Sequence, residues 1–266
     1  MPLEAEPEAP QIPPLPEGAL ADLLRNPDAP PWSGWDVVVI IVVFLLALIG
    51  ATVLMIAVGH LFQLRLEKAV AEARVLVPLQ LFSYLAALVA LWLIARYSYR
   101  RRFWQALEWN WPSGRRGALL LVAGAPLALV LQAVQSRLPA PPATPMEKYF
   151  RTPGDVYLMG LLAVAAAPLM EEVFFRGLLY PVLRRWGVAL AVVLTAAAFT
   201  LVHGSQYAWA WSAMLVLLVV GLALTLVRVL LRSVAAGFLL HLGYNLTLFV
   251  MLFLTTDHFR HMERGF

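Results

Sequence analysis

The chain has 266 residues, of which 61% are hydrophobic and only 14% are charged, with a formal net charge of +4. Soluble domains contain about 45–50% apolar and about 25% charged residues, so this composition excludes an ordinary soluble domain and indicates a protein embedded in the lipid bilayer, with no nucleic acid as a partner. The sequence contains no cysteine, which excludes disulfides and thiolate chemistry.

The first 36 residues differ in composition from the rest of the chain. Nine of the 19 prolines precede Trp32, and acidic residues are interleaved with them. A segment of this kind cannot bury a core, so we predict a disordered tail over residues 1–36. The tail lacks the basic and apolar regions of a signal peptide.

Seven apolar segments follow the tail. They are Val37–Gly59, Val75–Ala95, Gly117–Val134, Val156–Tyr180, the short Gly187–Val202, Ala208–Val227 and Ser233–Leu254. The sequence therefore predicts an all-α fold, a polytopic transmembrane helical bundle with about seven spans. We divide it into a three-span region (37–155), a core (156–254) and a C-terminal tail (255–266).

Arginines orient these spans. The 96–116 loop carries six arginines and one glutamate, Arg184 and Arg185 follow the fourth span, and Arg228 and Arg232 follow the sixth. The alternate loops hold fewer positive charges, so the three arginine-bearing loops are expected to be cytoplasmic, with the N-terminus on the same side. The short loops and the Arg/Ala/Leu-rich composition favour a multi-pass protein of a bacterial cell membrane.

The fourth span contains two adjacent glutamates and an arginine. A charge at the centre of a bilayer costs about 2.5–3.5 kcal/mol, so these residues are expected to have a role. Glu172 and Arg176 are four residues apart on one helix face and can form a structural ion pair. Glu171 is left without that partner, which suits a general base or acid. Pro168 removes one backbone hydrogen bond and is expected to kink this helix.

Two later spans carry further polar side chains at helical spacing. Phe199 and His203 lie one turn apart near the end of the fifth span, and His241 and Asn245 lie one turn apart in the seventh. Lipid offers these side chains no hydrogen-bond partner, so they must find one inside the bundle. Their distances from the span ends permit a single Glu–His–His–Asn cluster.

Three motifs in this region resemble those of a known family. "EEVFFR" fits EExxxR, "FTLVH" fits FxxxH and "HLGYN" fits HxxxN, in that order and on separate predicted spans. The chain is therefore similar, over about Val156 to Leu254, to the CPBP family of intramembrane proteases, which includes the CAAX prenyl endopeptidase and the Abi-type proteins.

The resemblance implies a glutamic-type intramembrane endopeptidase that cleaves a membrane-tethered protein or peptide. Glu171 with His203 would activate the attacking water, and His241 with Asn245 would stabilise the oxyanion. The resemblance gives Glu172, Arg176 and Phe199 supporting roles, and it implies no metal or other cofactor.

Other functions fit the same residues. Glu171, His203 and His241 also form a His2Glu set that suits a zinc-dependent membrane protease, although the sequence lacks an HExxH motif. Buried charges also occur in proton-coupled transporters, but we find no inverted repeat in the hydropathy. A membrane partner protein that retains the motifs without hydrolysing anything is a third alternative.

Overall fold

The computed structural model describes residues 31–62, 72–139, 149–150 and 152–260. Residues 1–30 of the predicted tail and residues 261–266 lie outside the described part of the chain. Residues 31–36 are part of the fold, because Trp32 is fully buried and the first described helix starts at Gly34, capped by the side chain of Ser33. The fold therefore begins slightly earlier than the expected end of the tail.

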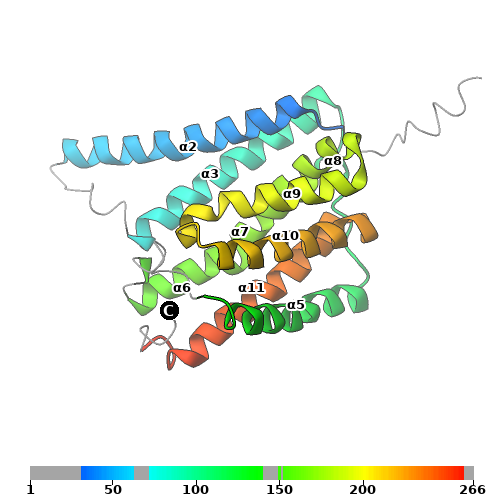
Figure 1. The fold of residues 1–266 in the computed structure, drawn as a ribbon. Helices are drawn as coiled ribbons and strands as arrows, with labels where there is room; N and C mark the ends of the chain where they lie inside the picture. Colours follow the sequence, from blue (N-terminus) through cyan, green and yellow to red (C-terminus); the bar gives the residue numbers. More distant parts are fainter. Residues whose placement is uncertain (1–30, 63–71, 140–148, 151, 261–266) are drawn as a thin grey trace, which may run out of the picture.

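The described residues form helices joined by short connections, with no strand among them (Figure 1). The longer α-helices are α2 (Gly34–Leu61), α3 (Ala73–Leu93), α5 (Gly114–Gln135), α9 (Val188–Val202), α10 (Trp211–Leu231) and α11 (Val234–Thr255). The shorter elements are η2 (Ile94–Ser98), α4 (Phe103–Ala106), α6 (Pro153–Leu161), η4 (Leu162–Ala166), α7 (Ala167–Glu171), η5 (Glu172–Leu179), α8 (Tyr180–Leu183), η6 (Arg184–Trp186) and η7 (Gly204–Tyr207).

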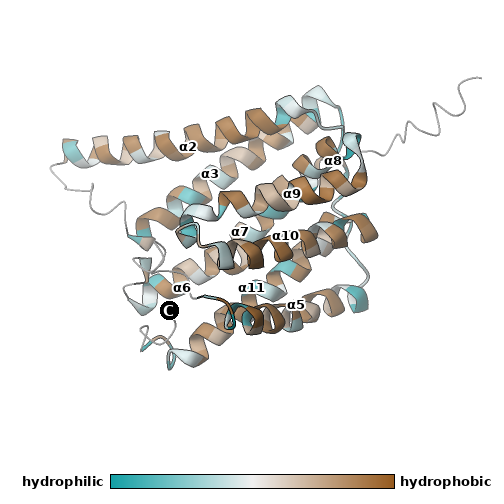
Figure 2. Ribbon diagram, viewed as in Figure 1, coloured by the Kyte–Doolittle hydropathy of each residue, from teal (hydrophilic) through white to brown (hydrophobic). Residues whose placement is uncertain are grey.

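Six helical stretches in the described residues are long and apolar enough to cross a membrane, and α9 is a shorter apolar helix. The elements from α6 to η6 form one such stretch, Pro153–Trp186. This architecture confirms the all-α, polytopic fold class. Figure 2 shows that the bodies of α2, α9, α10 and α5 are predominantly hydrophobic, as expected for surfaces that face lipid.

Two π-helical turns interrupt the stretch that carries the glutamates, and each lies just before a proline. In the first, the N–H of Ala167 bonds to the carbonyl of Leu162, five residues back, so the Ala163 carbonyl loses its usual helical donor. Pro168 follows immediately and has no N–H of its own. The helix continues through Pro168, and the disturbance expected there takes the form of a π-turn.

The second π-turn precedes Pro181. There the N–H of Tyr180 bonds to the carbonyl of Phe175, so the Arg176 carbonyl lacks its helical donor. The guanidinium of Arg228, on α10, donates to this carbonyl at 3.3 Å. The side chain of a neighbouring helix thus satisfies a backbone group that the π-turn has released.

The arginine-bearing loops gather at one end of the bundle, the right-hand end in Figure 1. We call it the arginine-rich end and define it by residues 96–116, 184–186 and 232–233. Backbone and side-chain bonds join these loops: the Val234 N–H donates to the Glu108 carbonyl, and the Asn110 amide donates to the Arg232 carbonyl. The sequence predicts that Arg228 follows the sixth span, but in the structure it lies within α10, is 2% exposed and pairs with Glu108.

Candidate active site

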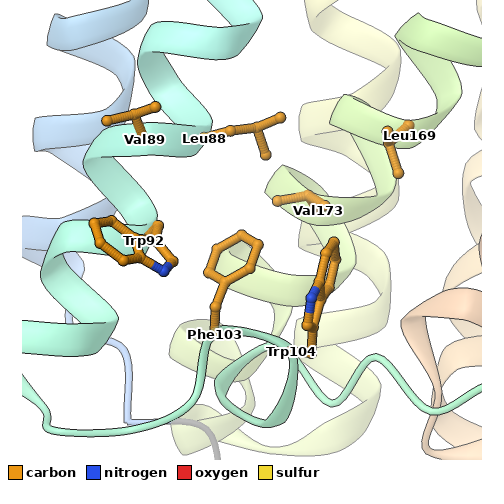
Figure 3. A pocket seen from close by; sticks show the side chains of 7 residues that line it. All are labelled: Leu88, Val89, Trp92, Phe103, Trp104, Leu169 and Val173. Carbon is orange, nitrogen blue, oxygen red and sulfur yellow. The ribbon is translucent and has the colours of Figure 1, made fainter.

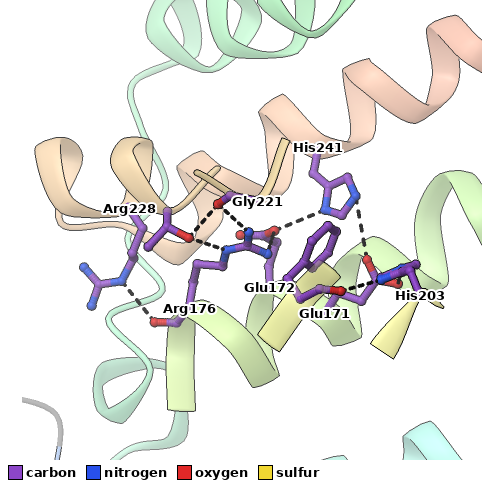
Figure 4. A network of polar contacts seen from close by, with 9 residues as sticks. Glu171, Glu172, Arg176, His203, Gly221, Arg228 and His241 are labelled. Carbon is purple, nitrogen blue, oxygen red and sulfur yellow. Dashed lines mark hydrogen bonds and ion pairs between the residues drawn. The ribbon is translucent and has the colours of Figure 1, made fainter. Parts of the chain in front are cut away.

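Glu171 lies between two histidines that come from different helices. The Nε2 atom of His203 is 3.6 Å from its Oε1, and the Nε2 atom of His241 is 3.7 Å from its Oε2 (Figure 4). His203 caps the C-terminus of α9, and His241 lies in α11. Both separations exceed a direct hydrogen bond and suit a bridging water or a substrate atom.

The second nitrogen of each histidine has a partner that determines the orientation of the ring. Nδ1 of His203 donates to the carbonyl of Phe199 at 2.7 Å, and Nδ1 of His241 donates to Oε1 of Glu172 at 3.1 Å. A carbonyl and a carboxylate can only accept, so Nδ1 carries the proton in both rings. Both Nε2 atoms are therefore presented to Glu171.

Glu172 and Arg176 form the ion pair expected from their spacing, with Nη1 2.9 Å from Oε1 and both side chains fully buried. The guanidinium also donates to the Gly221 carbonyl at 3.0 Å and to the Thr225 hydroxyl at 3.3 Å, both on α10. Glu172 thus joins α11 through His241, and Arg176 joins α10. A burial cost that would be high for isolated charges is offset by these bonds.

The ring of Phe199 lies among the charged and imidazole groups of the site. Its centroid is 4.8 Å from the guanidinium carbon of Arg176 and 4.6 Å from the centroid of His203. It also packs edge-on against His241 at 5.9 Å. Phe199 therefore contributes a cation–π contact and fixes two catalytic candidates by packing.

Asn245 extends the cluster along α11, one turn beyond His241. Its amide donates to the carbonyl of Ala163 at 2.7 Å, which is the carbonyl released by the first π-turn. The structure therefore brings Glu171, His203 and His241 into direct proximity and connects Asn245 to the helix of Glu171 through the backbone. An Asn amide has two N–H groups, so this bond leaves one for another acceptor.

Sequence reasoning missed three residues that support the cluster: Thr225, Gly237 and Arg228. A Cβ on Gly237 would lie 2.6 Å from Oε2 of Glu172, so only glycine leaves room for this carboxylate. Gly237 is four residues before His241, and Thr225 is four residues after Gly221. A search for small residues one turn from a motif residue would have found Gly237, whereas Thr225 lies on a helix without a motif and had no such signal.

A cavity of about 600 Å³ opens onto Glu171 and His203. The side chain of Glu171 is 19% exposed and that of His203 is 14% exposed, whereas His241 is 3% exposed. A separate pocket of about 240 Å³ lies between α3, α4 and the Glu171 helix, and its lining is wholly apolar (Figure 3). The larger cavity is therefore the one suited to hydrolytic chemistry.

Within the described residues, no group of three or more His, Asp or Glu side chains has a geometry that would hold a metal ion. The Nε2 atoms of His203 and His241 lie near different oxygens of Glu171. Whether the protein works without a metal stays a prediction, with its test given below.

Comparisons with known proteins give one result. Residues 153–247 match the family model described as Type II CAAX prenyl endopeptidase Rce1-like. Neither the search of curated proteins nor the search of solved structures found a match. The matched region contains all seven motif residues singled out above, and the family is one of proteases. This region of the chain is therefore similar to the Rce1-like type II CAAX prenyl endopeptidases, the protease family that the three motifs indicated.

Proposed function

We propose that this protein is an intramembrane endopeptidase that uses Glu171 and His203 to activate water. The observation that carries the proposal is the pair of Nε2 atoms, one near each oxygen of a carboxylate that faces a cavity and pairs with no arginine in the described part of the chain. Peptide hydrolysis without a Ser or Cys nucleophile needs such a base.

The first step is attack by water held between Glu171 and His203. The water gives a proton to the Glu171 carboxylate, and its oxygen forms a bond to the carbonyl carbon of the scissile peptide. The carbonyl electron pair moves onto its oxygen. When that pair returns, the C–N bond breaks, and the proton on Glu171 passes to the leaving nitrogen, so the products are a carboxylic acid and an amine.

The oxyanion of the intermediate needs hydrogen-bond donors, and His241 and Asn245 are proposed to supply them. Because Nδ1 of His241 already donates to Glu172, donation from Nε2 requires the doubly protonated ring. The carboxylate of Glu172 accepts a hydrogen bond from Nδ1 and would stabilise the charge of such a ring when it donates to the oxyanion. Glu172 therefore supports His241 as a donor.

The test compares membranes that contain the wild-type chain with membranes that contain Glu171→Gln. The family match supports a protease that acts on a membrane-associated protein or peptide. Quantitative proteomics of cells that express the wild-type chain and cells that express Glu171→Gln should therefore find a precursor that accumulates only with the variant. The precursor should then be cleaved by the purified wild-type protein in detergent and not by Glu171→Gln. Cleavage by both proteins at equal rates would refute the role of Glu171.

A further inference from the structure

The apolar pocket of about 240 Å³ and the cavity at Glu171 lie on different faces of the same helix. Leu169 and Val173, one turn apart, line the pocket, whereas Glu171, between them in the sequence, lines the larger cavity. Residues two apart point to nearly opposite sides of a helix. The pocket is therefore separate from the site proposed above.

The rest of the pocket wall comes from α3 and α4 and is aliphatic or aromatic (Figure 3). Leu88, Val89 and Trp92 belong to α3, and Phe103 and Trp104 belong to α4. Val89, Trp92 and Trp104 are 47%, 45% and 53% exposed. The pocket therefore opens at the outer surface of the bundle, where it is accessible to the chains of lipids.

The two tryptophans of the pocket each carry a hydrogen-bond donor that the protein does not use. The indole N–H of Trp32 donates to the carbonyl of Ala106 at 2.9 Å, but the indole N–H groups of Trp92 and Trp104 have no acceptor among the described residues. Tryptophans with an apolar body and a free N–H are typical of the level of lipid headgroups. The oxygen atoms of a headgroup would be suitable acceptors.

Positive charge lies beside the same pocket. The ring of Trp92 packs edge-on against Tyr97 at a centroid distance of 6.3 Å, and the guanidinium carbon of Arg96 lies 5.9 Å from the centroid of the Tyr97 ring. Arg102 is exposed and immediately precedes Phe103 of the pocket wall. Neither arginine forms an ion pair with an acidic residue in the part of the chain that the structure describes. Their charges are therefore available to an anion at the rim of the pocket.

We infer that this pocket binds an anionic phospholipid, with an acyl chain against Leu169 and Val173 and the phosphate near Arg96 and Arg102. Lipid chains are as apolar as the pocket lining, so burial of a chain alone does not favour the pocket over the surrounding bilayer. The charge of the headgroup does, because arginines near a membrane surface attract anionic lipids. The headgroup therefore determines which lipid the pocket selects.

A lipid chain in this pocket would support the helix of Glu171 on the side away from the active-site cavity. This helix contains the two π-turns, and Val173 belongs to the second. A ligand that binds the folded state alone raises its stability. Binding of the lipid should therefore raise the thermal unfolding midpoint, whether or not the protein is a protease.

The first test is native mass spectrometry of the purified wild-type chain in detergent. The protein is mixed with phosphatidylglycerol or with phosphatidylcholine that carries the same acyl chains. One phosphatidylglycerol molecule should be retained at concentrations at which phosphatidylcholine is lost, and it should raise the unfolding midpoint. Equal retention of the two lipids would overturn the inference.

The second test removes charges beside the pocket. Arg96→Gln and Arg102→Gln should each raise the Kd for phosphatidylglycerol about fivefold and leave that for phosphatidylcholine unchanged. Arg115→Gln is the matched control, because it removes an exposed arginine at the same end of the bundle from α5, which packs chiefly against α11. An equal loss in the control would show a general attraction to the arginine-rich end and would contradict a site at the pocket.

The third test fills the pocket with a side chain. Val89→Trp places a large group in the pocket wall, and Leu85→Trp is its control, at a residue of α3 that is 61% exposed and does not line the pocket. Val89→Trp should lose the retained phosphatidylglycerol, and Leu85→Trp should keep it. Retention by both variants would place the lipid elsewhere on the protein. If Val89→Trp does not fold, the arginine variants still decide the question.

Discussion

Glu171 and Glu172 are neighbours in the sequence but belong to two different regions of the site. On the cavity side, Glu171 is partly exposed and faces two imidazole nitrogens across gaps wide enough for water, and no described Lys or Arg forms an ion pair with it. On the core side, Glu172 is fully buried and bonded to Arg176 and His241. One residue of helical rotation, about 100°, separates these environments.

Two glutamates of one helix can therefore have different roles, one in catalysis and one in holding the fold, because different groups bind them. Bonds from both sides hold the core region, since α10 contributes Thr225 and α11 contributes His241. Only the histidines hold the cavity region, so its carboxylate remains available to a substrate. Substitutions in the cavity region should therefore lower turnover, whereas substitutions in the core region should lower stability.

The largest effect is expected from Glu171→Gln. The change keeps the volume of the side chain but removes the base, so cleavage should fall to background while the protein accumulates and unfolds like the wild type. Peptide cleavage by purified protein and the thermal unfolding midpoint in detergent measure the two properties. Wild-type turnover by Glu171→Gln would remove the distinction between the two glutamates.

Loss of an oxyanion donor should be the next largest effect. His241→Ala and Asn245→Ala are each expected to lower turnover about 100- to 1,000-fold at similar KM. In a zinc site the two would differ, because His241→Ala would lose the metal and Asn245→Ala would have little effect. Steady-state kinetics of both variants on one substrate make the comparison.

The core region is tested by Glu172→Ala and Arg176→Ala. Each removes one partner of a buried pair and leaves the other charge uncompensated, at a cost on the order of 3–5 kcal/mol. Abundance in membranes and the unfolding midpoint should fall together with activity. Normal abundance and stability with reduced turnover alone would show that this pair acts in catalysis and not in the scaffold.

A smaller loss of stability is expected from Gly237→Ala, whose methyl group would overlap Oε2 of Glu172. Overpacking of a core costs about 1–3 kcal/mol. Gly50→Ala is the matched control, because it is also within a helix and a Cβ there has no neighbour within 4 Å. The unfolding midpoint of the first variant should fall, and that of the second should stay the same or rise.

The smallest effect is expected from metal chelators. Asn245 is a poor zinc ligand and a good donor, so activity in detergent should survive phenanthroline. Two measurements check this: the rate of cleavage with and without the chelator, and the metal content of the purified protein. Stoichiometric zinc, with activity lost on stripping and regained on its return, would favour the metalloprotease alternative.

The sequence by itself determined the helices and the candidate residues of the site. Lipid leaves backbone groups no partner but the helix, so long apolar runs predicted the spans, and the i, i+4 spacing predicted the ion pair of Glu172 and Arg176. The same spacing placed Phe199 on the side of His203 and Asn245 on the side of His241. These features depend on neighbours along one helix, which the periodicity of the chain specifies.

Only the tertiary structure decided how the helices share these residues. The bond from His241 to Glu172, the burial of Arg228 and the bond of Asn245 to a carbonyl freed by a π-turn each join distant segments. Seven of the 15 residues that line the cavity likewise come from α2 and α3, which carry no motif. Periodicity specifies the face of a helix on which a side chain lies, but the depth and rotation at which two helices meet depend on packing over their whole length.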